Sequence, residues 1–151
     1  MQKIIYKILL SHQIELLSVS VLLLRCILGI ILFIVGAGKV FGWFSGFGME
    51  TTIKFYVQMG ISVPLAYTSC YTEFIGGLLL AVGFLTRPSA LAVAINMVVA
   101  TILTLPSGFL GSSGGASYPF TFAIIAISIL LSGPLKYSLD NLLFLHKKLV
   151  T

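Results

Sequence analysis

The sequence contains few charged residues, few cysteines and few histidines. Of its 151 residues, 9% are charged and 58% are hydrophobic. A soluble domain carries about a quarter charged residues, so too few polar side chains are present here to cover a surface in water. The composition therefore excludes a soluble globular domain and a disordered chain. The net charge of +5 does not indicate a nucleic-acid partner, because the basic residues have another explanation given below.

The scarcity of sulfur and imidazole ligands excludes several metal and redox classes. Two cysteines cannot form a disulfide scaffold or a thiolate cluster. His12 and His146 both fall outside the long apolar runs, so an intramembrane haem, zinc or di-iron site lacks ligands, and we expect no metal. Cys26 and Cys70 are expected at depths that differ by about 7 Å, at the limit for a disulfide. We interpret them as buried apolar thiols, with redox chemistry as the alternative.

Four long apolar runs dominate the chain. A helix needs about 20 mostly apolar residues to cross the hydrocarbon core of a bilayer. All five prolines fall at or near the ends of these runs, where proline begins or stops a helix. We therefore predict one all-α membrane domain, residues 1–151, with four transmembrane helices and a tight hairpin at Arg87. The predicted spans are 16–38, 64–85, 88–106 and 117–134.

The distribution of basic residues predicts the orientation. With the N-terminus inside, the cytoplasmic segments hold six basic residues and the outer segments hold two, which favours cytoplasmic N- and C-termini by the positive-inside rule. This bias accounts for the net charge through contact with lipid headgroups in an inner (plasma) membrane. The inner residues are Lys3, Lys7, Arg87, Lys136, Lys147 and Lys148, and the outer residues are Lys39 and Lys54.

Two shorter segments are too polar to cross the membrane. Residues 41–63 combine scattered aromatic residues with Glu50 and Lys54 at helical spacing, which predicts an amphipathic helix at the outer interface. This helix is either an aromatic anchor or a lid over an intramembrane pocket. Residues 137–151 predict a short surface helix that Ser138 caps.

Arg25 and Glu73 are the charged residues within the predicted spans. A charge at the centre of a membrane helix costs about 2.5–3.5 kcal/mol on translocon scales, so such residues usually face the bundle interior and pair. Counted from the inner ends of their spans, the two lie at about 13 Å and 18 Å, within reach of each other. We therefore predict an Arg25–Glu73 ion pair. The alternatives are a purely structural pair, a polar pocket for a quinone-like or anionic headgroup or a proton relay, and two charges that never meet.

The candidate binding site consists of this pair and nearby polar side chains. Tyr71 and Asn96 are expected to supply hydrogen bonds near Glu73. Gly76 and Gly77 permit close approach of a neighbouring helix, which is how small residues act in membranes. Gly76 follows Glu73 by three residues and so shares its helix face.

Several motifs resemble those of a known family. Arg25-x-x-x-Gly29-x-x-x-Phe33-x-x-Gly36-x-x-Lys39, the stretch from Glu73 to Arg87, and Ser138-Leu139-Asp140 together resemble the DoxX family of small membrane proteins. The resemblance implies a four-helix inner-membrane protein related to subunits of a terminal quinol oxidase and of thiosulfate:quinone oxidoreductase, or to thiol-stress complexes. Its matching charged positions are Arg25, Lys39, Glu73 and Arg87.

These observations support three hypotheses. The first is a membrane subunit of a quinone-linked or thiol-stress-related oxidoreductase, which binds a quinone non-covalently and docks a redox partner protein. The second is a non-catalytic scaffold or assembly factor in which the charge pair only fixes the fold. The third is a small-solute carrier, which the absence of evident inverted repeats disfavours.

Overall fold

The computed structural model describes residues 2–110 and 115–145, with side chains described for 12–110 and 115–143. The described part is helical and contains no strand, which confirms the predicted all-α class. Short helical turns, Leu105–Ser107 and Asn141–Leu145, accompany five α-helices. The α-helices are α1 (Gln2–Phe41), α2 (Gly48–Gln58), α3 (Val63–Val82), α4 (Thr86–Thr104) and α5 (Ser117–Ser132).

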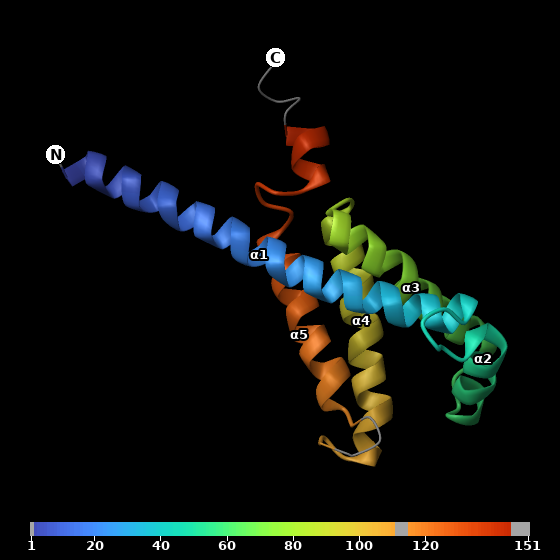
Figure 1. The fold of residues 1–151 in the computed structure, drawn as a ribbon. Helices are drawn as coiled ribbons and strands as arrows, with labels where there is room; N and C mark the ends of the chain where they lie inside the picture. The colour runs from blue at the N-terminus through green and yellow to red at the C-terminus, as the bar shows by residue number, and fades with distance from the viewer. Residues whose placement is uncertain (1, 111–114, 146–151) are drawn as a thin grey trace.

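The long helices correspond to the four predicted spans. Within the described residues, three segments are long and apolar enough to cross a membrane, namely His12–Phe41, Val63–Val82 and Thr86–Ser107. The shorter apolar helix α5 completes the bundle (Figure 1). Helix α3 ends three residues before the predicted boundary because Gly83 adopts a left-handed conformation (φ 72°) and closes the helix. The predicted hairpin follows, and α4 begins at Thr86.

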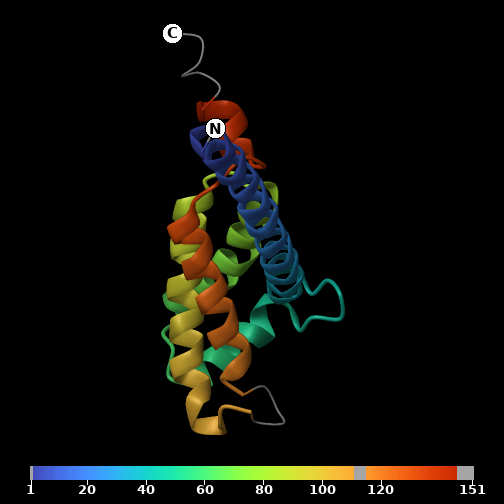
Figure 2. The same ribbon diagram turned by 90° about the vertical axis from the view of Figure 1, so that its left-hand side faces the viewer.

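The helices pack as two pairs, α1 with α3 and α4 with α5. Helix α1 crosses the bundle obliquely, and its N-terminal half extends beyond the other helices (Figures 1 and 2). The core lies where α1 and α3 meet α4 and α5. Its buried side chains include Leu28, Leu32, Leu80, Ala90, Val93, Phe122, Ala126 and Ile129.

The outer surface of the bundle is apolar, as lipid contact requires. On α1, Leu23, Ile27, Ile30 and Ile34 are each at least 40% exposed. Because lipid, unlike water, solvates such residues favourably, their exposure agrees with a helix that crosses a bilayer. The chain is therefore a multi-pass membrane protein, and the cytoplasmic placement of its termini stays a prediction.

The first and last described segments lie at the same end of the bundle. Lys136 Nζ, beyond α5, donates a hydrogen bond to Glu15 Oε1 of α1 at 2.9 Å. The Glu15 carboxylate raises the pKa of Lys136. We call this end, which also contains the α3–α4 hairpin, the Arg87 end, and we call the opposite end of α1 and α3 the Lys39 end. Of the predicted C-terminal surface helix, the turn Asn141–Leu145 is described, and 146–151 lie outside the described residues.

The predicted amphipathic helix is α2, at the Lys39 end. Its Thr52 and Ile53 side chains are buried, whereas Glu50 and Lys54 form the expected exposed pair with Nζ 2.7 Å from Oε1. That hydrogen bond lowers the pKa of Glu50. Helix α2 thereby places a further residue, Tyr56, beside the end of α1.

Candidate functional site

A buried ion pair joins α1 to α3 at the Lys39 end. Lys39 Nζ donates to Glu73 Oε1 at 2.7 Å and lies 2.6 Å from Oε2. The Glu73 side chain is 5% exposed and that of Lys39 is 24% exposed. A pair this buried is retained only with close geometry and added hydrogen bonds, because Glu73 has lost nearly all of its water and Lys39 most of it.

Two more polar side chains complete this cluster. Tyr56 of α2 accepts a hydrogen bond from Lys39 Nζ through its hydroxyl oxygen at 2.9 Å. Asn96 of α4 approaches from the other side, with Nδ2 3.5 Å from Glu73 Oε1. The cluster Lys39–Glu73–Tyr56–Asn96 therefore draws one residue from each of α1, α2, α3 and α4.

The predicted Arg25–Glu73 ion pair is wrong. Arg25 is 2% exposed, but its guanidinium donates to the backbone oxygens of Pro134 at 3.3 Å and Tyr137 at 2.6 Å. It lies against Gly83, where an added Cβ atom would be 2.6 Å from Cζ. Gly83 is ten residues beyond Glu73, so the two charges sit about 15 Å apart along α3. Arg25 belongs to the Arg87 end and holds the segment that follows α5.

The error arose from measuring depth by the start of each apolar run. Helix α1 is apolar from about His12 to Phe41, which is about 45 Å at 1.5 Å per residue and exceeds a hydrocarbon core of about 30 Å. The first apolar turns of α1 therefore extend beyond the end of α3. The starts of the two apolar runs do not lie at the same depth in the membrane. The actual register places Gly36 against Phe74, and Lys39 follows Gly36 by about one turn.

Asp140 closes the hairpin at the Arg87 end. Its carboxylate accepts hydrogen bonds from the backbone N–H groups of Leu85 (2.7 Å) and Thr86 (2.8 Å), at the start of α4. The Thr86 hydroxyl itself caps nothing, because it is buried without a partner among the described residues. Ser138 caps the following turn as expected, since its Oγ accepts from Asn141 N at 3.1 Å. Arg87 is exposed and lies beside Gly133.

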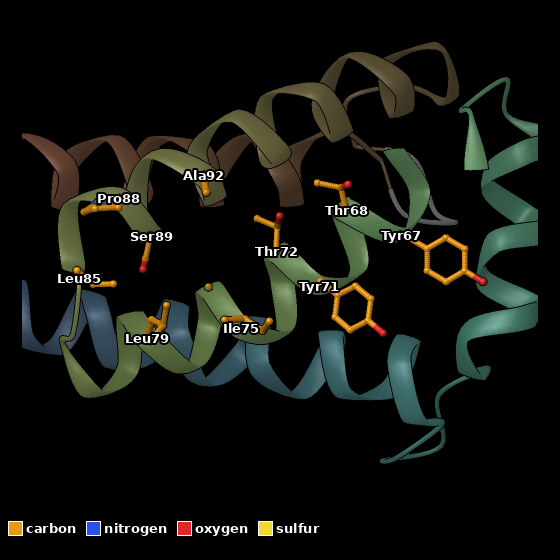
Figure 3. Close-up of a pocket in the computed structure, with 11 residues that line it drawn as sticks. Tyr67, Thr68, Tyr71, Thr72, Ile75, Leu79, Leu85, Pro88, Ser89 and Ala92 are labelled. Carbon is orange, nitrogen blue, oxygen red and sulfur yellow. The ribbon is translucent and has the colours of Figure 1, made fainter. Parts of the chain in front are cut away.

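Tyr71 lines an open groove between α3 and α4. The groove has a volume of about 530 Å³, and its wall also includes Thr72, Ile75, Gly76 and Ser89 (Figure 3). Tyr71 is 44% exposed on this face, and no hydrogen bond joins it to Glu73 within the described residues. The groove thus opens toward lipid along α3 and α4.

The two neighbouring glycines have different partners. A Cβ atom on Gly77 would lie 2.5 Å from the backbone nitrogen of Phe33, so Gly77 permits the predicted close approach of a neighbouring helix, which is α1. A Cβ atom on Gly76 would meet the side chain of Val93 at 3.0 Å. Gly76 therefore faces α4 and the groove rather than α1.

A second hollow lies on the other side of Lys39. It has a volume of about 300 Å³ and is formed by the last turns of α1, by Thr52 and by the loop that leads to α2. Lys39 lines it, together with the aromatic side chains of Trp43, Phe44 and Phe47. The hollow thus includes a member of the ion pair, whereas the lining of the groove contains neither Lys39 nor Glu73.

The cysteines remain apart. Cys26 and Cys70 are both free, and Cys70 is fully buried. Within the described residues, no group of three His, Cys, Asp or Glu side chains is placed to hold a metal ion. The Lys39–Glu73–Tyr56–Asn96 cluster is therefore the candidate functional site.

Sequence reasoning placed Glu73 and Asn96 correctly but missed two members of the cluster. Lys39 was assigned to topology and to the matching charged positions of the family, because it lies at the end of an apolar run, and Tyr56 is one of the aromatic residues of 41–63 that were assigned to the interface. The available signal was the spacing Gly36-x-x-Lys39, which puts the lysine one turn beyond a helix-contact glycine.

The fold and this cluster define a class: a small helical membrane protein with a buried lysine–glutamate pair. Comparison with known protein families identifies the family. The chain belongs to the DoxX family, whose model matches residues 20–106. That match contains every member of the cluster. The chain is also 33% identical over 132 residues to the Bacillus subtilis (strain 168) protein named "Putative oxidoreductase CatD", covering 87% of this chain and 92% of that protein. No solved structure matches.

Proposed function

We propose that this chain is a membrane subunit of a quinone-linked oxidoreductase system. The observation that carries the proposal is the buried Lys39–Glu73 pair with Tyr56 and Asn96, held between helices that cross the membrane. Ionisable groups at such depth are costly and usually serve a ligand or a proton path. The name of the Bacillus relative, an oxidoreductase, agrees with this chemistry.

In such a reaction, the cluster binds the quinone oxygen and supplies protons, whereas the electrons come from elsewhere. Reduction of a quinone to a quinol consumes two electrons and two protons. The electrons come from a redox partner protein with a flavin or a dithiol, since the two cysteines of this chain do not meet. Lys39, Tyr56 and Glu73 form a continuous hydrogen-bonded row that donates to a quinone oxygen and conducts the two protons, which the oxidation of the reduced flavin or dithiol releases.

Quinone retention tests the proposal. We would purify the chain from native membranes in a mild detergent and measure quinone in an organic extract by mass spectrometry. We expect near-stoichiometric quinone with the natural chain and loss of it in Glu73→Gln. The matched control is Glu50→Gln, which breaks the exposed pair on α2 and should retain quinone. A natural chain that carries no quinone, or equal retention in all three proteins, would refute the proposal.

A second candidate function is a non-catalytic scaffold, favoured by the fact that Lys39 contacts both oxygens of Glu73. Removing one partner of a buried pair costs about 3–5 kcal/mol, whereas replacing both with apolar residues is often neutral. Lys39→Met with Glu73→Leu should therefore stay folded. Under the scaffold function, membranes containing this double variant reduce quinone at the normal rate. Under the quinone-linked function, they lose that activity although the protein is present.

A further inference from the structure

The hollow beside Lys39 is bounded by an unusual loop. Phe44 and Ser45 both adopt left-handed backbone conformations (φ 54° and 63°), which cost free energy for residues with a side chain. The loop is nevertheless fixed. Gly42 N donates to Gly38 O at 3.1 Å, and Gly46 packs so closely on Gly38 that no Cβ atom would fit. Figure 2 shows this loop projecting sideways from the end of α1.

The loop presents its aromatic side chains around the hollow. Trp43, Phe44 and Phe47 line it and are 53%, 64% and 83% exposed. Trp43 also stacks on Phe41, with ring centroids 4.9 Å apart, and exposed aromatic faces favour stacking with a further planar ring. The volume of about 300 Å³ is at the lower end for small-molecule sites, so it suits a single headgroup.

Lys39 supplies the polar group of the hollow. An ammonium group has three N–H donors. Within the described residues, Lys39 Nζ lies within hydrogen-bond distance of three oxygens: Glu73 Oε1 at 2.7 Å, Glu73 Oε2 at 2.6 Å and Tyr56 Oη at 2.9 Å. A quinone oxygen in the hollow that Lys39 lines would therefore share the ammonium with these oxygens, in place of the contact to Oε2.

We infer that this hollow binds the ring of the quinone, with the ring between Trp43, Phe44 and Phe47 and one carbonyl oxygen accepting a hydrogen bond from Lys39. This inference rests on the proposed function and gives the quinone a position. The ring lies on the loop side of Lys39 rather than in the groove between α3 and α4. A groove lined by Tyr71 and Ile75 is the competing position.

Tryptophan fluorescence tests the position directly, because Trp43 is the sole tryptophan in the sequence. We would titrate the full chain in nanodiscs with tetramethyl-1,4-benzoquinone, whose ring quenches indole at close range. We expect saturable quenching of Trp43. Phe44→Ala should weaken the apparent Kd by about threefold to tenfold, as expected for the loss of one stacking partner. Phe44 is mostly exposed, so this variant should fold normally.

Two reporter variants separate the possible positions. Trp43→Phe with Ile75→Trp places the tryptophan in the groove, and Trp43→Phe with Phe55→Trp places it on exposed α2 as a control for quinone dissolved in the bilayer. Saturable quenching confined to Trp43 supports the inference. Quenching that saturates only for the tryptophan at position 75, or equal non-saturating quenching of all three, overturns it. Quinone retained on purification without saturable quenching of Trp43 overturns this position while leaving the proposed function intact.

Discussion

Gly77 and Gly76 are adjacent, yet an added methyl group should have different effects at the two positions. A Cβ atom on Gly77 would lie 2.5 Å from Phe33 N, 2.8 Å from Gly29 O and 3.0 Å from Leu32 C. All three are backbone atoms of α1, which cannot rotate away. Because ordinary contact begins near 3.5 Å, Gly77→Ala must push α1 and α3 apart by about 1 Å.

The cost follows from overpacking. Inserting a methyl group into a packed interior typically costs about 1–3 kcal/mol, and the better helix propensity of alanine returns about 0.5–1 kcal/mol. We expect Gly77→Ala to lose about 1–2 kcal/mol. The added Cβ atom of Gly76→Ala meets two side chains, Thr72 at an ordinary 4.0 Å and Val93 at 3.0 Å, and only Val93 must shift, by a few tenths of an ångström. There the two effects should nearly cancel, to within about 0.5 kcal/mol.

A thiol-reactive fluorogenic maleimide, added during heating in detergent, measures this difference. Cys70 is fully buried and free, so it reacts when the bundle opens. Gly77→Ala should lower the Tm by about 2–8 °C, whereas Gly76→Ala should leave it nearly unchanged. Equal Tm values for the two variants, or a larger loss for Gly76→Ala, would show that α1 and α3 do not approach each other as described.

Three further variants test the Arg87 end and the control pair. Arg25→Met removes the two hydrogen bonds that hold the segment after α5. We therefore expect the free energy of unfolding to fall by about 2–3 kcal/mol and trypsin to cleave faster after Lys136. Unchanged cleavage would contradict this role of Arg25. Asp140→Ala removes the cap of α4 and should cost about 0.5–2 kcal/mol in the same heating assay, with no effect if Thr86 capped the helix itself. Glu50→Gln should leave the Tm nearly unchanged because the pair is exposed. Since Lys54 lowers the pKa of Glu50, any difference should be present above the ordinary value of 4.5 and vanish as the pH falls through the lowered one.

The sequence was sufficient to predict which segments form helices. Long apolar runs and terminal prolines predict helices from local sequence, because each helix in lipid must make its own backbone hydrogen bonds. This is why the Arg87 hairpin, the amphipathic α2 and a helix at each of the four predicted spans appear, although α5 is shorter than a full span and α1 begins well before residue 16. The pairing of charges depends instead on how far one helix slides along another. Apolar run length could not give that distance for α1, whose apolar stretch exceeds the bilayer core.

The positions of the glycines nevertheless indicate the register of α1 against α3. Close helix contact in a membrane requires small residues, and α1 and α3 meet where Gly29 and Gly36 lie against Gly77 and Phe74. In two antiparallel helices, residue numbers rise along one helix as they fall along the other. Because Gly36 lies opposite Phe74, Ala37 lies opposite Glu73. The nearest cation on α1 is then Lys39, not Arg25, which falls opposite the chain reversal at Gly83. Charge pairing between membrane helices is therefore better predicted from the small residues that set the contact than from the depth of each charge in its own apolar run.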